Sequence, residues 1–155
     1  MHPDNIPLLN RIKMECVTIA EIQEKIIDDF LMFEEAMDKY EHIIELGKNL
    51  PIIEERYKTK DNLINGCQSR VWLHAELKDR NIIFTADSDA IITKGIIALL
   101  IRILSGHTPK EIAESKLFFI DQIGLKKLFS LTRNNGLLEM VKQMKMYAIT
   151  FQTND

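Results

Sequence analysis

Cysteine is scarce in this chain of 155 residues, which contains only Cys16 and Cys67. Iron–sulfur clusters usually need four protein ligands, mostly thiolates, and two cysteines far apart in sequence do not supply them. The four histidines are scattered and complete no zinc-type spacing with either cysteine. We therefore expect no metal site.

Three other absences exclude broad classes of protein. No stretch approaches the roughly 20 apolar residues of a membrane span, and the most apolar run, residues 95–104, is short and includes Arg102. The first residues lack the basic start and apolar core of a secretory signal. The net charge of −3 is the opposite of a basic nucleic-acid surface. We expect a cytoplasmic protein, in which a disulfide is not expected either.

What the chain does have is enough apolar content for one core. Hydrophobic residues make up 46% of it, a share that suits a single globular domain at this length. No internal repeat, low-complexity tract or Gly/Ser linker divides it. We predict one domain over residues 1–155, with residues 1–17 and 152–155 as candidates for mobile ends.

Apolar residues recur at helical spacing in the first third of the chain. Thr18 and Glu21 have the spacing of a capping box, and a helix is predicted from there to about Phe33. A second helix is predicted to face the core with Met37 and to end at Gly47, which suits a C-terminal cap.

Three further helices are predicted downstream. Residues 90–105 are apolar nearly all round, which is typical of a helix at the centre of a core, and residues 87–89 offer its N-cap. Residues 108–111 form a second capping box with proline at the first helical position. A last helix is predicted from about Leu137.

Between these helices the periodicity changes to alternation. Val71, Leu73 and Ala75 fall on one side of a predicted strand, residues 78–81 form a polar turn, and residues 82–86 form the return strand. Residues 62–65 can add a short third strand. The predicted fold is therefore α+β, with a small antiparallel sheet of about three strands packed against several helices.

Cys67 is the residue best suited to chemistry. Gly66 removes side-chain bulk beside the thiol and permits a positive φ, so we expect Cys67 at an exposed turn. An unperturbed thiol has a pKa of about 8.5, so only a small fraction is thiolate at neutral pH unless positive charge lies nearby. Arg70 and Arg133 are the candidates for that charge. Taken alone, these residues leave open a buried, inert cysteine.

Other candidates have ordinary explanations. Cys16 fits a partly buried thiol without a role, and His74 fits a histidine satisfied on a strand. Lys94 in the apolar helix fits a side chain that extends to the surface. No phosphate-binding glycine loop or nucleophile-elbow serine is present.

Short motifs run in a fixed order through most of the chain. They are Lys39–Gly47 with Leu50–Pro51, Asn65–Trp72, Asp87–Ala90 with Lys94–Gly95, Thr108–Pro109, Arg133 and Asn135–Leu137. On these residues, above all the Gly-Cys-Gln-Ser-x-Val-Trp core, the chain resembles the SufE family of cysteine desulfuration proteins. The resemblance covers roughly residues 33–148, and the chain departs from it mainly at the two ends.

The resemblance implies a sulfur acceptor for a pyridoxal-phosphate-dependent, SufS-like cysteine desulfurase. Cys67 would take persulfide sulfur, stimulate the desulfurase and pass the sulfur to iron–sulfur cluster assembly. The implied fold is shared with iron–sulfur scaffold proteins, with Cys67 on a loop sheltered by apolar residues. The chain would need no cofactor, because the pyridoxal phosphate belongs to the partner, and it would be a monomer or weak homodimer without independent turnover.

The remaining site residues are candidates for roles that assist Cys67. Supporting roles are expected for Gly66, Gln68, Ser69 and Arg133, and partner binding for Arg70, Trp72, Asp87 and Asp89. Two alternatives stay open. The chain could be a scaffold on which a cluster is built, or a non-catalytic desulfurase adaptor whose Cys67 is incidental.

Overall fold

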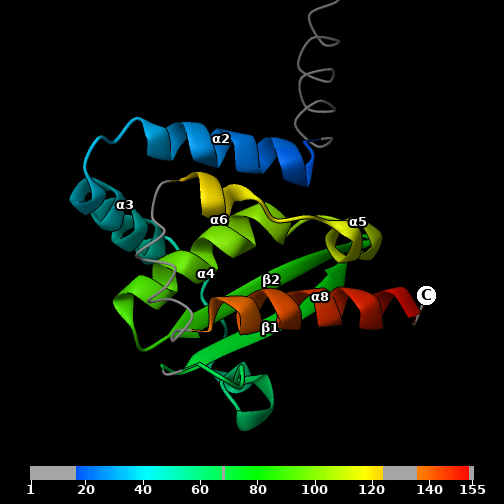
Figure 1. Cartoon of the computed structure of the whole chain (residues 1–155). Helices are drawn as coiled ribbons and strands as arrows, with labels where there is room; N and C mark the ends of the chain where they lie inside the picture. Colours follow the sequence, from blue (N-terminus) through cyan, green and yellow to red (C-terminus); the bar gives the residue numbers. More distant parts are fainter. Residues whose placement is uncertain (1–16, 68, 124–135, 154–155) are drawn as a thin grey trace, which may run out of the picture.

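The computed structural model of the chain describes residues 17–67, 69–123 and 136–153. Helices lead up to a β-hairpin and follow it (Figure 1). The elements are α2 Ile19–Leu31, α3 Ala36–Lys48, the 3-10 turns η1 Glu55–Tyr57 and η2 Lys60–Asn62, β1 Val71–Lys78, β2 Asn81–Ser88, α4 Ile91–Leu104, α5 Pro109–Glu114, α6 Phe119–Gln122 and α8 Leu137–Thr153. This confirms the predicted α+β class.

The two strands form a regular antiparallel hairpin. Val71 pairs with Ser88 at one end and Lys78 with Asn81 at the other. Asp79 and Arg80 make the connection with φ of 51° and 71°. Two left-handed residues suit the right-handed twist of the strands, which is why a two-residue loop closes the hairpin.

The third strand expected at residues 62–65 is absent from the described part of the sheet, which has two strands. Leu63 forms only an isolated antiparallel bridge to Trp72, and the amide of Ile64 donates to the carbonyl of Val71 at 2.9 Å. The physical reason is that η2 ends at Asn62 while Gly66, at φ +88°, turns the chain. Too few residues remain between them for a strand.

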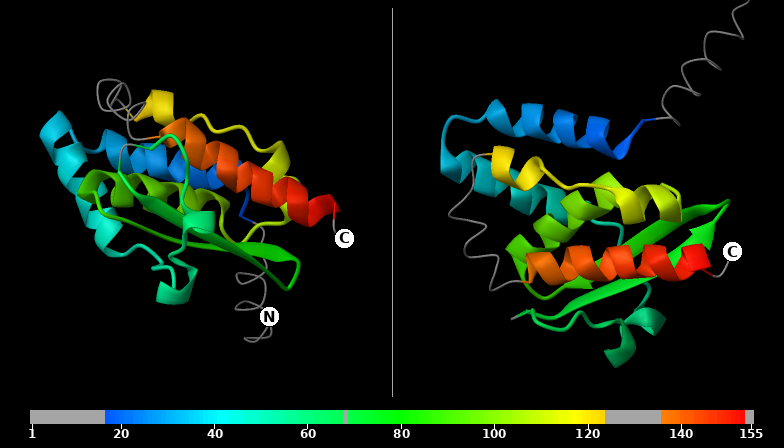
Figure 2. Two further views of the ribbon diagram at one scale, coloured as in Figure 1. Left: turned by 90° about the horizontal axis from the view of Figure 1, so that it is seen from below. Right: turned by 45° about the vertical axis from the view of Figure 1, so that its right-hand side comes forward.

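The hairpin lies between the helices and the short η1–η2 segment (Figures 1 and 2). Its fully buried face, which includes Leu73, Ile82 and Phe84, belongs to the same apolar core as α4 and α8. On the other face, the rings of His74 and Tyr57 stack with centroids 3.7 Å apart. The alternation predicted from the sequence therefore separates a core face from a face covered by η1.

Helix α4 is central, as its apolar composition predicts, and nine of its fourteen residues are buried. It approaches α3 closely, because a Cβ on Gly95 would overlap the carbonyl oxygen of Ile43. A Cβ on Gly47 would lie 2.9 Å from the amide nitrogen of Gly95. The prediction that Gly47 caps α3 is wrong: α3 continues to Lys48, and the glycine permits the helix crossing.

Two predictions about side chains in the helices are also wrong. Met37 is 65% exposed, whereas Lys39 is buried and its Nζ donates to the carbonyl of Ile123 at 3.0 Å. The N-cap of α4 is Ala90, without a side-chain hydrogen bond, because the carboxylates of Asp87 and Asp89 are engaged elsewhere. In both cases a tertiary partner overrides the local pattern.

The predicted helix ends agree better with the structure. Thr18 Oγ1 accepts from the amide of Glu21 at 3.1 Å, and α2 ends at Leu31, close to the expected end. Both halves of the capping box of α5 are present. Among the expected mobile ends, residues 152 and 153 belong to α8, whereas residues 1–16, 154 and 155 lie outside the described part.

A buried glutamine joins α2 to the segment before α6. Gln23 is fully buried, and its Oε1 accepts from the amides of Phe118 and Phe119 at 2.8 and 3.1 Å. Its Nε2 donates to the carbonyl of Lys116 at 3.0 Å. Both polar atoms of this side chain are thus used to hold an irregular segment in the core. No helix in the described ranges is long and apolar enough to cross a bilayer.

Candidate functional site

Cys67 lies on a loop between Ile64 and Val71, which we call the Cys67 loop. Its two ends are joined by the hydrogen bond from the Ile64 amide to the Val71 carbonyl. Gly66 turns the chain just before the cysteine with φ +88°, a conformation that favours glycine. The sequence therefore places the thiol on a tight turn shortly before β1, as predicted.

The thiol itself is half-buried rather than open to solvent. It rests against Gly136, the residue before α8, and a Cβ on Gly136 would overlap Cys67 Sγ. Gly136 also has a positive φ, +78°, so both the space and the backbone conformation require glycine there. The prediction of an exposed turn holds for Gly66 but not for the sulfur, which packs against the apolar core.

The surroundings of the thiol oppose ionisation. Burial raises the pKa of Cys67, and the carboxylate of Glu139, in the first turn of α8, raises this pKa further. The expected help from Arg70 is absent in this conformation, because its Nε donates to Asp89 Oδ2 at 3.2 Å. In the resting arrangement Cys67 is therefore a neutral thiol and a poor nucleophile.

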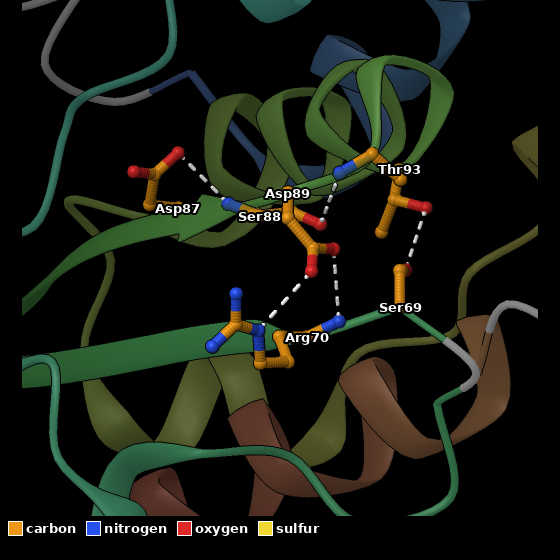
Figure 3. A network of polar contacts seen from close by, with 7 residues as sticks. Ser69, Arg70, Asp87, Ser88, Asp89 and Thr93 are labelled. Carbon is orange, nitrogen blue, oxygen red and sulfur yellow. Dashed lines mark hydrogen bonds and ion pairs between the residues drawn. The ribbon is translucent and has the colours of Figure 1, made fainter.

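The side of the loop after Cys67 is anchored to the start of α4 (Figure 3). Ser69 Oγ and Thr93 Oγ1 form a hydrogen bond at 3.2 Å. The amide of Arg70 donates to Asp89 Oδ1 at 3.0 Å, and the Asp89 amide donates back to the Arg70 carbonyl at 3.3 Å. These contacts fix the backbone that leads from the cysteine into β1.

Asp87 is tied to two other elements. Its carboxylate pairs with Lys58 Nζ at 2.6 Å and with Lys94 Nζ at 3.4 Å. Burial alone would raise the pKa of Asp87, but hydrogen bonds from Lys58 and the Ser88 amide, with the charges of both lysines, lower it below its usual range. Lys94 thus extends toward the surface and forms an ion pair there, as expected for a lysine in an apolar helix.

Two cations lie close to the ring of Trp72 on the η1 side of the hairpin. Lys58 Nζ is 5.4 Å and Arg70 Cζ 5.3 Å from the centre of its ring. Both distances suit cation–π attraction. His74 is held on the same face by Tyr57 and by Glu76 Oε1, 3.0 Å from its Nε2. A structural role accounts for His74, as expected.

The structure thus gathers some of the predicted site residues and separates others. Gly66, Ser69, Arg70 and Asp89 belong to the Cys67 loop or its anchor. Trp72 and Asp87 are paired across the hairpin. Both contact Lys58 rather than the Cys67 loop anchor formed by Ser69 and Asp89. Gln68, Arg133 and Cys16 lie outside the described residues.

Sequence reasoning missed Glu139, and it noted Gly136 only as part of the Asn135–Leu137 motif, without a place beside the thiol. The available signal was weak: Gly136 precedes a predicted helix, and an acidic residue in a first turn is ordinary. Only the packing of α8 against the Cys67 loop gives either residue its place next to the sulfur. Within residues 17–67, 69–123 and 136–153, no group of three or more His, Cys, Asp or Glu side chains is placed to hold a metal ion.

Comparison with protein families gives one match over most of the chain. The SufE model, described as an Fe-S metabolism associated domain, matches residues 24–148. The chain is 39% identical over 127 residues to the chloroplastic/mitochondrial SufE-like protein 1 of Arabidopsis thaliana, covering 81% of this chain but only 34% of that protein. It therefore spans about a third of the length of this plant relative.

Two further relatives carry related names. An uncharacterised SufE-like protein of Rhizobium meliloti is 40% identical over 130 residues, covering 81% of this chain and 93% of that protein. The cysteine desulfuration protein SufE of Plasmodium vivax is 32% identical over 120 residues, covering 75% and 48%.

A solved structure has a similar fold. The solution structure of a hypothetical protein from Thermus thermophilus superposes with a TM-score of 0.71, covering 85% of this chain and 96% of that one. At 17% identity this likeness concerns the fold alone.

Proposed function

Because this chain belongs to the SufE family, we propose that Cys67 accepts the outer sulfur of a persulfide carried by a pyridoxal-phosphate-dependent cysteine desulfurase. The observation that carries the proposal is the half-buried thiol on a glycine turn, packed against a second glycine at the start of α8. A thiol held this way is shielded at rest, yet only a short turn must move to present it to a partner.

The chemistry is thiol–disulfide exchange with a single sulfur atom as cargo. The Cys67 thiolate attacks the outer sulfur of the donor persulfide, and a new S–S bond forms at Cys67 as the donor S–S bond breaks. The electron pair of the broken bond leaves with the donor thiolate, which can take the proton that Cys67 lost. No external oxidant or reductant is needed.

The raised pKa of the resting thiol is consistent with a carrier that reacts only at its partner. Burial is the main cause of the shift, so leaving the contact with Gly136 lowers the pKa and increases the thiolate fraction. Shielding also protects the resting thiol from stray oxidants. We propose that Gln68, the next residue in sequence, and Arg133 help to hold the anionic sulfur during transfer.

The partner contacts are proposed for the residues around the loop. Arg70 and Asp89 are exposed beside Cys67, and Trp72 is partly accessible on the adjacent strand. A desulfurase that engages Arg70 would compete with its bond to Asp89. We propose that the sulfur then passes to iron–sulfur cluster assembly in the cytoplasm, and that the chain acts as a monomer or weak homodimer without a cofactor of its own.

Stimulation of a cysteine desulfurase tests this role. Alanine production from cysteine is measured with the wild-type chain, Cys67→Ser and Cys16→Ser as the matched control. We expect stimulation by the wild type and Cys16→Ser and none by Cys67→Ser, because only Cys67 can take the sulfur. Equal stimulation by all three would show a non-catalytic adaptor. A second series with Arg133→Ala tests the proposed help from that residue, which predicts slower transfer.

A further inference from the structure

Glu139 faces the Gly66–Cys67 turn from the first turn of α8. A Cβ built on Gly66 would lie 3.0 Å from Glu139 Cγ and 3.5 Å from its carboxyl carbon. The favourable dipole of a helix N-terminus explains why α8 tolerates an acidic residue here. It does not explain why the carboxylate lies against the turn that carries the thiol.

Among the residues that the structure describes, the other charged groups beside this turn do not outweigh the negative charge of Glu139. A hollow of about 440 Å³ lies beside the turn. The charged side chains that line it are Asp61, on the side of the loop, and Glu139 and Lys142, on α8. Two carboxylates and one ammonium group therefore line it, and Glu139 is the one whose charge acts on Cys67.

We propose that Glu139 couples the charge of the sulfur at position 67 to the position of the turn, so that a neutral thiol stays against Gly136 and an anionic sulfur moves away. The inference rests on the sulfur-acceptor role proposed above. Glu139 is then a positioning residue, because it acts on the turn that carries Cys67 and not on the persulfide of the desulfurase.

The physical argument is the reciprocity of linked equilibria. Glu139 and burial raise the pKa of Cys67, so the same interactions favour the neutral form in the resting position. Whatever disfavours the anion there must equally favour movement of an anionic sulfur out of that position. A hydropersulfide is a stronger acid than the corresponding thiol, so we expect a loaded Cys67 to lose its proton to water more readily than the free thiol does. Sulfur transfer would thus convert a neutral occupant into an anion beside a carboxylate.

Two adducts of nearly equal size can separate charge from bulk. In a Cys16→Ser background Cys67 is the only thiol. Iodoacetamide gives a neutral carbamidomethyl group, and iodoacetate gives a carboxymethyl group of almost the same shape with a negative charge. Amide hydrogen exchange in residues 64–67 then reports how firmly each adduct holds the turn.

The expected result is at least about threefold faster exchange in the carboxymethyl adduct than in the carbamidomethyl adduct, given the strength of close like charges. In Glu139→Gln this ratio should fall toward one. Asp61→Asn is the matched control, because it removes a carboxylate from the opposite wall of the same hollow, and it should keep the ratio. Thermal unfolding of each variant checks that the fold is intact.

A second readout uses the unmodified thiol. At pH 7 the rate of alkylation by iodoacetamide should be at least about threefold higher in Glu139→Gln than in the parent, and unchanged in Asp61→Asn. Equal exchange in the two adducts, or a ratio that Glu139→Gln does not alter, would overturn the inference. Neither experiment involves a desulfurase, so a failure here is distinct from a failure of the acceptor role, which the stimulation assay detects.

Discussion

The two sides of the Cys67 loop are held in different ways. After the cysteine, Ser69 and Arg70 are fixed to α4 and Asp89 by hydrogen bonds and an ion pair. Before and at the cysteine, Gly66 and Cys67 are held against Gly136 and α8 by packing, and the carboxylate of Glu139 opposes ionisation of the thiol. We call these the anchored side and the thiol side of the loop.

This difference teaches how one loop can combine precision with movement. Directional hydrogen bonds keep the anchored side in register with β1, so the position at which the thiol emerges is fixed. Contacts between two glycines and a sulfur are weaker and not directional, so the thiol side can separate from α8 at low cost. Shielding and presentation of the thiol then need no change in the hairpin.

The largest effect is expected when the thiol side is forced away from α8. In Gly136→Ala the new methyl group would overlap Cys67 Sγ at a backbone φ of +78°, so the thiol must leave its resting position. We expect alkylation of Cys67 at pH 7 to become roughly tenfold faster or more, because the exposed thiol is no longer desolvated. Timed iodoacetamide labelling followed by mass spectrometry measures it.

Gly106→Ala is the matched control for this substitution. Gly106 has a similar φ of +84°, but a Cβ there meets nothing within 4 Å. Both variants should lose about 1–2 kcal/mol of stability from backbone strain, and only Gly136→Ala should expose the thiol. Equal labelling rates in the two variants would refute the contact between Gly136 and the sulfur.

A smaller effect is expected when the anchored side is loosened. Asp89→Ala removes the acceptor for the amide and the Nε of Arg70. We expect a loss of about 1 kcal/mol, because these contacts are largely exposed, together with faster exchange of the Arg70 amide. Urea unfolding and hydrogen exchange measure the two quantities. Asp28→Ala, which removes an exposed carboxylate on α2, is the control. If Asp28→Ala lost as much stability as Asp89→Ala, the anchoring role of Asp89 would be contradicted.

Acid should weaken the ion pairs through which Asp87 joins the hairpin to Lys58 and to Lys94 of α4. The folded pKa of Asp87 lies below its unfolded value, so its stabilising contribution is present above the unfolded pKa and is lost as pH falls through the folded pKa. The free energy of unfolding, measured between about pH 6 and pH 2, should therefore fall less steeply in Asp87→Asn than in the wild type. Parallel curves for the two proteins would show that Asp87 is not the responsible group.

The smallest effect is expected for the fluorescence of Trp72, which should not change when Cys67 is modified. This residue is the only tryptophan of the chain and it contacts Arg70 on the anchored side. Carbamidomethylation of Cys67 should leave its fluorescence maximum unchanged, whereas Asp89→Ala should shift it to longer wavelength as Arg70 leaves the ring. A shift on carbamidomethylation would mean that both sides of the loop move together.

The sequence predicts those parts of the fold that depend on local pattern. Alternation places Leu73 in the core and His74 on the opposite face, and the capping box at Thr108 begins α5. Prediction fails where a distant partner decides. Gly47 serves a crossing with α4 rather than a cap, and Lys39 replaces Met37 in the core. The expected third strand fails for a local reason, because η2 and Gly66 leave too few residues for it.

The site divides in the same way. Cys67, Gly66 and the neighbouring polar residues follow from one continuous motif, so the sequence indicates them directly. Gly136 and Glu139 are about 70 residues away along the chain, and only the packing of α8 brings them to the thiol. The ordinary roles of a helix-end glycine and a first-turn glutamate conceal their position beside the sulfur.

The most direct test of the central claim is to follow the sulfur atom itself. A cysteine desulfurase is supplied with cysteine labelled with a heavy sulfur isotope and mixed with the chain, and the products are analysed by peptide mass spectrometry without reductant. We expect one labelled sulfur atom on the peptide that contains Cys67, removable by reductant, in both the wild type and Cys16→Ser. Labelled sulfur on Cys16 instead, or an unmodified Cys67 beside a fully loaded desulfurase, would contradict the account.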